Sequence, residues 1–280
     1  MGAILINSKI LKENKVAELK QCVDSMNRKP KLVIISASDD KASENYIRNK
    51  VKIGAEIGID VEVLKEERSV TTVELGWTIN QLNMDKDVDA IILQLPVYPH
   101  LDSKTLIQSI HPSKDADCFS SHFLGELLQG RGDIKPCTPQ GVLNLLEQHK
   151  VDVVGKDVVV IGRSTHVGLS LSVLLTQKGA TVTTCHSKTV NLKEKVSNAD
   201  IVVSCVGSME LIDPTWMKTG SVLIGVGISV DENFKQQTDY NVDAMLELSK
   251  CSMVGDRLNT TGTATVLALM ENVVKLANNY

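Results

Sequence analysis

Apolar residues along this chain fall into two patterns, which alternate from one end to the other. Short continuous apolar runs are typical of buried strands, whereas apolar residues at every third or fourth position are typical of helices. In the N-terminal part, the runs predict strands over residues 32–36, 61–64 and 90–94. The helical spacing there is carried by Val16, Leu19, Val23 and Met26, by residues 42–57, and by Leu75, Ile79 and Leu82. This alternation predicts parallel sheets with helices on both faces.

The alternation continues in the C-terminal part. The apolar runs predict strands over residues 158–161, 181–185, 201–204 and 221–225, and a final helix carries Val266, Leu269, Met270 and Val273 on one stripe. Residues 113–139 form a long, polar and glycine-rich connection between the two parts, and connections of that length are usually functional. At its end, Thr138-Pro139 predicts a helix N-cap followed by proline at the first helical position.

The run 158–161 leads straight into Gly162–Gly168, and helical spacing resumes after it. A glycine directly after a buried strand lets the backbone turn tightly, and the following helix then directs its N–H groups and positive end at a phosphate. This pattern predicts a dinucleotide site that includes Gly162, Arg163, Ser164 and Gly168. Ser164 stands where the usual G-x-G-x-x-G fingerprint has its second glycine, and Gly168 falls one residue late. An ordinary strand–loop–helix connection is therefore the alternative interpretation.

The residues after the next predicted strand favour NADP over NAD. NAD sites usually place an acidic residue there, which accepts hydrogen bonds from the ribose 2′-hydroxyl. This chain has Ser187 and Lys188 instead, and Arg163 lies in the glycine loop. A hydroxyl and two cations suit a 2′-phosphate, which a carboxylate would repel. In the alternative interpretation, Arg163 and Lys188 are solvated surface charges.

These patterns predict an α/β protein of two α/β lobes around a cleft. We expect residues 121–264 to form a Rossmann-like NAD(P)-binding domain. Residues 1–120, completed by the C-terminal helix over 265–280, are expected to form the domain that carries the chemistry.

Composition and charge exclude several classes of function. A net charge of −4 and a pI near 5.9 argue against nucleic acid or an anionic membrane as the main partner. No apolar run approaches the roughly 18 residues of a membrane helix, and the N-terminal residues do not resemble a secretory signal. The six cysteines are scattered without a C-x-x-C pair and the six histidines do not cluster, so we expect no metal site and no disulfides. Reduced core cysteines are typical of a cytoplasmic protein.

Tyr46 and Lys50 are the first candidates for chemistry, because their i, i+4 spacing on a predicted helix brings their side chains together. We expect Ile47, Val51 and Ala55 to form the stripe of this helix that packs into the core, which leaves the Tyr–Lys pair on the polar face. A ring and an amine placed together could stack on a flat substrate and deliver a proton or a charge. The alternative is an ordinary pair on a solvated helix.

Two further features lie near predicted strand ends. Gln94 interrupts an apolar run at the carboxyl end of a predicted strand, which is where open α/β sheets bind ligands. It could hold a nearby amine, or it could simply end the strand. Asp115 and Asp117 open the long connection. A carboxylate can clamp the N–C–N edge of a heterocycle with two hydrogen bonds, although aspartates in turns more often cap the local backbone.

The order and spacing of these pieces resemble the methylenetetrahydrofolate dehydrogenase/cyclohydrolase family. The segments that carry the resemblance are Ala42-Ser43-x-x-Tyr46-x-x-x-Lys50, Gln94-Leu95-Pro96, Pro112-x-Lys114-Asp115-x-Asp117, Pro136-Cys137-Thr138-Pro139, Gly162-Arg163-Ser164-x-x-Val167-Gly168, Cys185-His186-Ser187-Lys188-Thr189 and Val226-Gly227-Ile228. Each motif is modest, but their joint order is highly specific, and it spans the chain from about Ile4 to the last helix.

The resemblance implies an enzyme of one-carbon metabolism and purine biosynthesis. Such an enzyme oxidises 5,10-methylenetetrahydrofolate with NADP+ and hydrolyses the methenyl product to 10-formyltetrahydrofolate. The resemblance also implies a cytoplasmic homodimer that is joined through its cofactor domain.

The resemblance assigns roles to individual residues. It implies that Lys50 is the general acid/base, that Tyr46 stacks on the folate, that Gln94 orients the lysine and that Asp117 holds the pterin. The other residues that it places at the substrate or the cofactor are Leu93, Leu95, Gly262, Gly162, Arg163, Ser164, Gly168, Ser187 and Ile228. Among these, Arg163 and Ser187 would take the 2′-phosphate.

This chain departs from the family pattern at several positions around the expected substrate site. Residues 258–265 replace the family's Pro-Gly-Gly-Val-Gly-Pro-Met-Thr loop and keep only Gly262 and Thr265. Cys118 stands where the family has glycine, and a positive φ there would cost on the order of 1 kcal/mol. Other departures are Ser38, Lys41 and the Ile224-Gly225 pair. Two alternatives follow: a dehydrogenase with altered substrate use, or a catalytically silent NADP(H)-binding regulatory module.

Overall fold

The computed structural model describes residues 3–230, 236–256 and 260–278. The chain divides into two compact units. The N-terminal unit holds Glu13–Cys137 and Val266–Tyr280, and the C-terminal unit holds Met1–Lys12 and Thr138–Thr265. The division after Cys137 comes 17 residues later than the boundary expected after residue 120, and the first twelve residues belong to the C-terminal unit.

A three-stranded parallel sheet forms the centre of the N-terminal unit, in the order β3-β2-β4. Its strands are β2 (Lys31–Ser36), β3 (Asp60–Lys65) and β4 (Ala90–Gln94), which confirms the three predicted runs. The helical segments of this part of the chain are α1 (Lys9–Asp24), α2 (Lys41–Ile57), α3 (Thr72–Met84), α4 (Ser103–Ser109), η1 (Pro112–Lys114) and α5 (Ser121–Leu128). The unit is completed by most of α10 (Thr261–Asn278).

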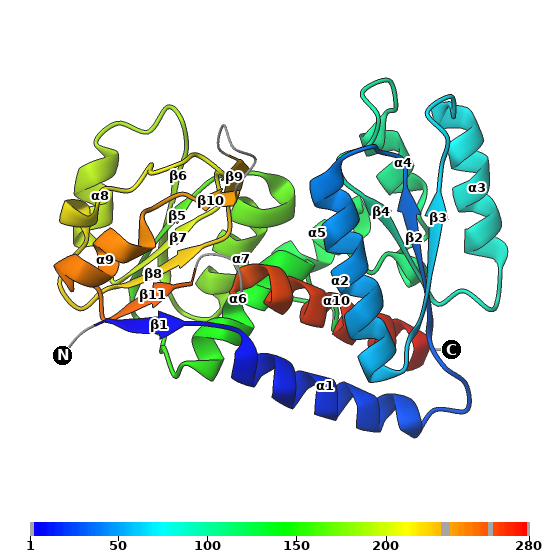
Figure 1. Ribbon diagram of the computed structural model, residues 1–280, viewed down its shortest axis with the longest axis horizontal. Coiled ribbons are helices and arrows are strands. Elements are labelled where there is room, and N and C mark those ends of the chain that lie inside the picture. The colour runs from blue at the N-terminus through cyan, green and yellow to red at the C-terminus, as the bar shows by residue number, and fades with distance from the viewer. Residues whose placement is uncertain (1–2, 231–235, 257–259, 279–280) are drawn as a thin grey trace. The chain divides into compact units, whose positions relative to one another are not determined.

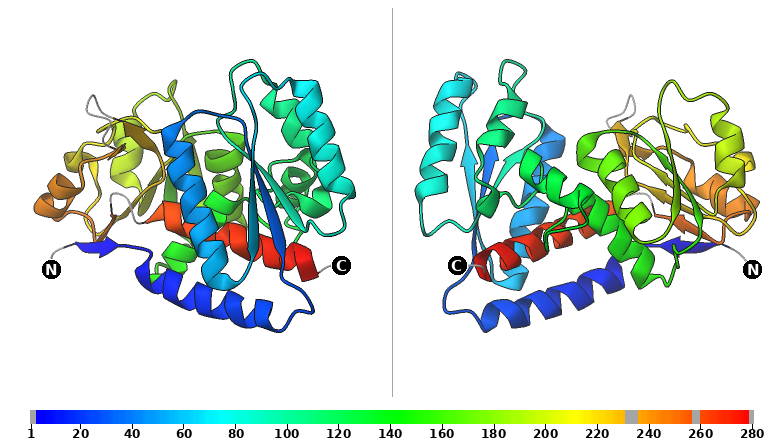
Figure 2. Two further views of the ribbon diagram at one scale, coloured as in Figure 1. Left: turned by 45° about the vertical axis from the view of Figure 1, so that its right-hand side comes forward. Right: turned by 180° about the vertical axis from the view of Figure 1, so that it is seen from behind.

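Helices cover both faces of this sheet, as the alternation predicts. Leu75 and Ile79 of α3 and Leu106 of α4 join Val33 and Ile91 of the sheet in one buried cluster. Figure 2 shows α3 and α4 on one side of the sheet and α2 on the other. The middle of the sheet is therefore buried. β2 ends at Ser36 and β4 ends at Gln94, and these two residues lie opposite each other in the sheet.

The C-terminal unit contains a six-stranded, wholly parallel sheet in the order β1-β11-β8-β7-β5-β6. Its strands are β1 (Ile4–Ile6), β5 (Asp157–Ile161), β6 (Thr181–Cys185), β7 (Ile201–Ser204), β8 (Val222–Gly225) and β11 (Met253–Gly255), and a hairpin pairs β9 (Ile228–Val230) with β10 (Gln236–Thr238). The helical segments of this unit are α6 (Cys137–Gln148), η2 (Thr165–Leu169), α7 (Ser170–Gln177), α8 (Leu192–Asn198), η3 (Pro214–Trp216) and α9 (Val242–Leu248).

Figure 1 shows α8 and α9 on one side of the six-stranded sheet and α6 and α7 on the other. Val196 of α8 and Met245 of α9 pack with Val159, Val202 and Leu223 of the sheet. This doubly covered parallel sheet confirms the prediction of an NAD(P)-binding type of α/β fold in the C-terminal part.

The connection over residues 113–139 contains more regular structure than its composition suggests. α5 lies inside it, held by the buried side chains of Phe123 and Leu127. α6 begins at Cys137, so Thr138 lies in the first turn and does not act as the expected N-cap.

The positions of the cysteines and the lengths of the helices address the expectations of core cysteines and of no membrane helix. Cys118, Cys137, Cys185 and Cys251 are buried, as expected of core residues, whereas Cys22 is exposed. In the described part of the chain, no helix is both long enough and apolar enough to cross a membrane.

Candidate active site

Helix α2 places Lys50 on its buried face. The side chain of Asp40 caps the helix by accepting a hydrogen bond from the backbone N–H of Ser43 (2.7 Å). The buried positions of α2 are Ser43, Ile47, Lys50, Ile53, Gly54 and Ile57. The expected core stripe is therefore wrong beyond Ile47, because Ala55 is exposed and Val51 is half-buried.

The close approach of α2 to the sheet explains why the helix buries a different face from the expected one. A Cβ at Gly54 would lie 2.4 Å from Cγ2 of Val61, so glycine is what lets this face of the helix pack against β3. Lys50, one turn earlier on the same face, is carried into the interior with it.

Lys50 is 4% exposed and is surrounded by polar and aromatic groups. Its Nζ donates a hydrogen bond to Oε1 of Gln94 (3.0 Å) and lies 4.8 Å from the centre of the Tyr46 ring. Burial lowers the pKa of the Lys50 amine, while the nearby Asp117 and Cys137 act in the opposite direction. A buried amine with a lowered pKa gives up its proton more readily than an exposed lysine, so it can take part in proton transfer.

Gln94 is the last residue of β4, which confirms its predicted place at a carboxyl strand end. Its Nε2 donates to the carbonyl oxygen of Leu95 (2.8 Å), which fixes the amide so that Oε1 faces Lys50. The Leu95–Pro96 peptide bond is cis. Leu93, by contrast, turns its side chain into the core.

The two aspartates of the long connection have different surroundings. Asp115 is buried and accepts a hydrogen bond from the backbone N–H of Ser120 (2.8 Å), which is the local capping role. Asp117 is half-buried and its charge acts on Lys50. Cys118, directly after it, is fully buried and has a φ of 58°, so the strain considered for this position is present.

Cys137 also belongs to this cluster, although the sequence suggested only a core residue. Its thiol donates to the carbonyl oxygen of Ala116 (3.3 Å) and lies within hydrogen-bonding reach of Asp117. Burial raises the pKa of the Cys137 thiol well above its usual value, so the group remains protonated and acts as a donor. The signal that could have identified it is the Pro136-Cys137-Thr138-Pro139 motif.

In the C-terminal unit, the glycine loop joins β5 to η2 and α7. Gly162 has a φ of 125° and lies against the backbone of Cys205. A Cβ at Gly168 would lie 2.2 Å from the carbonyl oxygen of Gly162, so the first helical turn packs directly on the loop. The backbone can pack this closely only because neither position carries a side chain, and a glycine turn followed by a helix start fits a dinucleotide phosphate.

The residues expected at the 2′-phosphate follow two neighbouring strands. The N–H of Gly162 donates to the carbonyl oxygen of Cys185 (2.8 Å), so the loops after β5 and β6 leave the sheet side by side. Arg163 and Ser187, in these two loops, are both exposed. Ser164 and Ile228 are exposed as well, in the loop after β5 and at the start of β9.

Asp239 is a structural residue of this unit that the sequence did not reveal. It is fully buried and accepts hydrogen bonds from the hydroxyl of Ser204 and from the backbone N–H groups of Val206 (3.1 Å) and Ser208 (2.7 Å). A Cβ at Gly227 would lie 2.6 Å from its Oδ2. Asp239 therefore fixes the loop after β7 against the loop after β8.

The altered C-terminal segment is described from Thr260 onward, and Leu258 and Asn259 lie outside the described residues. Gly262 lies in the first turn of α10, and a Cβ there would have no neighbour within 4 Å. The hydroxyl of Thr261 donates to the carbonyl oxygen of Gly225 (3.0 Å), and that of Thr265 donates to Oγ1 of Thr138 (3.4 Å).

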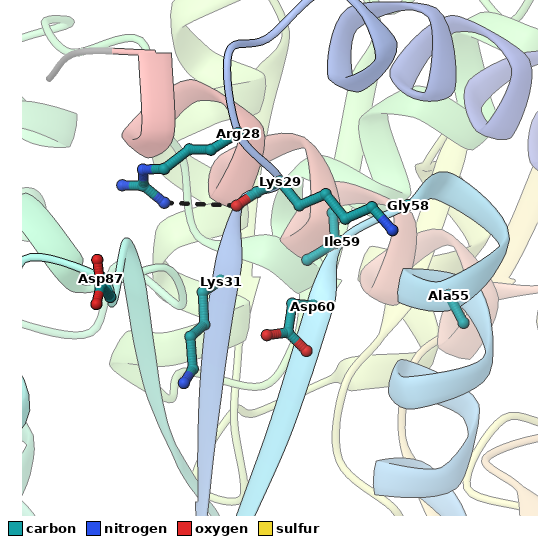
Figure 3. Close-up of a pocket in the computed structure, with 8 residues that line it drawn as sticks. All are labelled: Arg28, Lys29, Lys31, Ala55, Gly58, Ile59, Asp60 and Asp87. Atoms are coloured by element: carbon teal, nitrogen blue, oxygen red, sulfur yellow. Dashed lines mark hydrogen bonds between the residues drawn. The ribbon is translucent and has the colours of Figure 1, made fainter.

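A cavity of about 590 Å³ lies at the opposite, amino ends of β2 and β3, lined by Lys31 and Asp60 among others (Figure 3). Its charges are mixed, and two of its cations are paired with carboxylates. Arg28 at its edge forms two hydrogen bonds to the carboxylate of Asp89, and Lys31 pairs with Glu62 (2.8 Å). This cavity contains none of the predicted site residues.

A parallel dinucleotide-binding sheet in one unit and a buried, amide-held lysine in the other define a nucleotide-dependent enzyme with proton-transfer chemistry. Comparison with known proteins identifies the family. The model of the tetrahydrofolate dehydrogenase/cyclohydrolase catalytic domain matches residues 5–117, and that of its NAD(P)-binding domain matches residues 136–280. The chain belongs to the tetrahydrofolate dehydrogenase/cyclohydrolase family.

Individual relatives match over nearly their whole length. The bifunctional protein FolD of Vesicomyosocius okutanii is 38% identical over 270 residues, which cover 96% of this chain and 97% of the relative. The crystal structure of the bifunctional FolD enzyme from Campylobacter jejuni has a TM-score of 0.94 at 33% identity, with 99% of each chain covered. The Trypanosoma brucei enzyme, complexed with NADP and an inhibitor, has a TM-score of 0.94 at 30% identity, covering 100% of this chain and 98% of that one.

Proposed function

We propose that this protein oxidises 5,10-methylenetetrahydrofolate to 5,10-methenyltetrahydrofolate with NADP+ and hydrolyses that product to 10-formyltetrahydrofolate. Membership of the family supports both activities. The observation that carries the proposal is the buried Lys50 amine, held 3.0 Å from Gln94 and with a lowered pKa. A silent regulatory module has no physical need for an ionisable amine buried at such a cost.

Lys50 is the proton-transfer group of the hydrolysis. Adding water to the methenyl bridge requires one proton to leave the attacking water and another to reach the nitrogen that departs from the bridge. The neutral amine of Lys50 accepts the first, and the resulting ammonium can donate the second. The remaining hydroxyl proton of the intermediate is released to solvent as the C–N bond breaks and the formyl C=O forms. The hydrogen bond to Gln94 keeps Nζ in place during both steps. Arginine could not replace it, because a guanidinium stays charged.

The neighbours of Lys50 bind and orient the substrate. Tyr46 offers a ring face beside the amine, on which a flat pterin can stack. Asp117 offers a carboxylate that can accept two hydrogen bonds from an N–C–N edge. We include Leu95, Gly262 and the backbone of Leu93 in the substrate site on the resemblance to the family.

NADP+ supplies the hydride acceptor when it is bound. Gly162, Ser164 and Gly168 would hold its phosphates at the turn after β5, and Ile228 would contact it at the start of β9. Arg163 and Ser187 would hold the 2′-phosphate, because they lie in adjacent exposed loops and offer a cation and a hydroxyl.

One assay tests the proposed function directly. Purified protein is mixed with methylenetetrahydrofolate and with NADP+ or NAD+, and the reduced nicotinamide and the methenyl chromophore are followed together. We expect reduced nicotinamide to accumulate while the methenyl signal is consumed. A folded, cofactor-bound protein that produces neither signal would leave the regulatory alternative.

The pH dependence of the hydrolysis gives a second expected result. Because the pKa of Lys50 is lowered, the rate should rise with pH through that lowered value and level off below the ordinary lysine pKa of about 10.4. The unfolded chain binds this proton more tightly than the folded chain, so Lys50 also makes stability rise with pH between the two pKa values. A rate that climbs until about pH 10 would contradict this proposal.

Arg163→Ala tests the proposed 2′-phosphate site. We expect the affinity for NADP to fall about tenfold or more, because a charge-assisted hydrogen bond worth about 1.5–3 kcal/mol is lost, whereas the affinity for NAD should change little. Titration of each cofactor by calorimetry measures both values. Lys178→Ala, an exposed cation at the end of α7, serves as the control. Equal losses for the two cofactors would place the 2′-phosphate elsewhere.

We further propose that the protein acts as a cytoplasmic homodimer and contributes to purine biosynthesis. The family resemblance supports this assignment. Sedimentation equilibrium of the purified protein tests the dimer, since a mass near 30.5 kDa would identify a monomer.

A further inference from the structure

We propose that Asn272 of α10 is a positioning residue that holds Asp117 in place and thereby sets the electrostatic environment of Lys50. This inference rests on the proposed function, in which Lys50 transfers protons. It adds a residue from the C-terminal helix to the site, and it depends on contacts within the N-terminal unit alone.

Asn272 lies among mostly apolar residues on the buried face of α10 and is 3% exposed. Its Nδ2 donates to the carbonyl oxygens of Ala116 (2.8 Å) and Lys135 (2.9 Å). The two hydrogens of the amide are thus directed at two separate loops. The same nitrogen lies 3.7 Å from Sγ of Cys118 and 3.5 Å from Sγ of Cys137.

These contacts surround Asp117 in the sequence and in space. Ala116 and Cys118 are its two chain neighbours, and the thiol of Cys137 lies within hydrogen-bonding reach of its carboxylate. On the other side, the N–H of Ala116 donates to the carbonyl oxygen of Ile91 in β4 (3.4 Å). Ala116, the residue before Asp117, is therefore tied to the sheet through its N–H and to α10 through its carbonyl.

Cys118 gives Asn272 particular importance in this chain. Its φ of 58° is one that L side chains rarely adopt, so the local backbone is under strain directly after Asp117. A strained turn keeps its conformation only where contacts with the rest of the protein hold it. The hydrogen bonds from the Asn272 amide are among these contacts.

The position of Asp117 matters because its charge favours the protonated form of Lys50. The titratable groups that face Lys50 are Asp117, Cys137 and Tyr46. Those that surround the Asp117 turn are Asp115, Cys118, Lys135 and Lys275. If Asp117 moves away, burial acts on the amine with less opposition, and the proton leaves Lys50 at a lower pH.

The test compares Asn272→Leu with Val273→Ala. Leucine has nearly the shape of asparagine but donates no hydrogen bond, whereas Val273→Ala leaves a cavity on the same helix and keeps Asn272 intact. For each variant we measure kcat and KM of the hydrolysis, its pH profile, the affinity for NADP and the melting temperature.

We expect Asn272→Leu to lower kcat/KM of the hydrolysis on the order of 10- to 100-fold and to move the acid limb of its pH profile to lower pH, with NADP affinity unchanged. Val273→Ala should lower the melting temperature and leave the acid limb in place. Asn272→Ser, which keeps at most one of the two bonds, should give an intermediate shift, and it carries the test if the leucine variant does not fold.

The possible failures can be told apart. If the wild-type protein does not hydrolyse the methenyl substrate, the proposed function fails. If the wild type is active but the Asn272 variants lose only melting temperature, as Val273→Ala does, then Asn272 is purely structural and the inference is overturned. An acid limb that moves to higher pH would overturn it as well.

Discussion

Lys50→Met abolishes hydrolysis of the methenyl substrate, with an expected loss of about 100- to 10,000-fold in kcat, the range that general acid–base catalysis contributes. Methionine fills most of the volume of the buried lysine and cannot take up a proton. NADP affinity should survive, because the residues proposed to bind it belong to the C-terminal unit. Decay of the methenyl chromophore measures the hydrolysis, and quenching of protein fluorescence measures the cofactor affinity.

Lys52→Met is the matched control. Lys52 lies on the same helix but is exposed, so its replacement should leave the hydrolysis within a factor of about two of the wild type. Lys50→Met should also keep the protein folded, since a buried amine is replaced by an apolar side chain. If the methenyl substrate is hydrolysed at the normal rate, Lys50 has no part in the proton transfer.

Gly168→Ala is expected to have the second largest effect, this time on the cofactor. Its Cβ would lie 2.2 Å from the carbonyl oxygen of Gly162, a backbone atom that no side-chain rotation can move. The loop must shift, so the free energy of unfolding should fall by about 1–3 kcal/mol. The N–H groups at the start of the helix would shift with it, and one or two charge-assisted hydrogen bonds to the dinucleotide would be lost. The affinity for the dinucleotide should therefore fall at least tenfold.

Gly76→Ala provides the control for the change from glycine to alanine. Gly76 lies inside α3, and a Cβ there would have no neighbour within 4 Å. Alanine should therefore stabilise the protein by about 0.5–1 kcal/mol and leave cofactor binding unchanged. Chemical denaturation measures both variants. A Gly168→Ala protein that binds NADP as tightly as the wild type would show that the glycine turn does not hold the dinucleotide.

The strands that the sequence predicts well are those with continuous apolar runs. β2, β4 and β5 are each buried on both faces, and a two-sided core leaves this signature in a single stretch of chain. β1 and β11 have three residues each and pair across about 250 positions. Their stability comes from the pairing itself, which the local sequence does not encode.

The orientation of α2 could not be decided from spacing. One candidate core stripe runs through Ile47, Val51 and Ala55, and the observed one runs through Ile47, Lys50 and Gly54. Both fit a helical period, and the first is the more apolar. The second occurs because Gly54 lets α2 approach Val61, which is a tertiary contact. Pairing Tyr46 with Lys50 was still correct, because i, i+4 neighbours meet whichever way the helix faces.

The supporting groups of the site were the hardest to foresee. Asn272 interrupts an apolar stripe and Asp239 lies in a short polar segment, and neither position differs in sequence from an ordinary surface residue. Their importance comes from the carbonyl and N–H groups that they meet in the fold. The residues proposed to perform chemistry can be found from their types and spacing, whereas the partners that hold them depend on the tertiary structure.

The edge of the six-stranded sheet also limits the order in which the protein can assemble. β1 leaves the ribosome well before its partner β11, which lies about 250 positions later in the chain. The N-terminal unit likewise needs α10, whose Asn272 contacts Ala116 from more than 150 positions further along. Neither unit can therefore reach its final form on the nascent chain until these later segments have been synthesised.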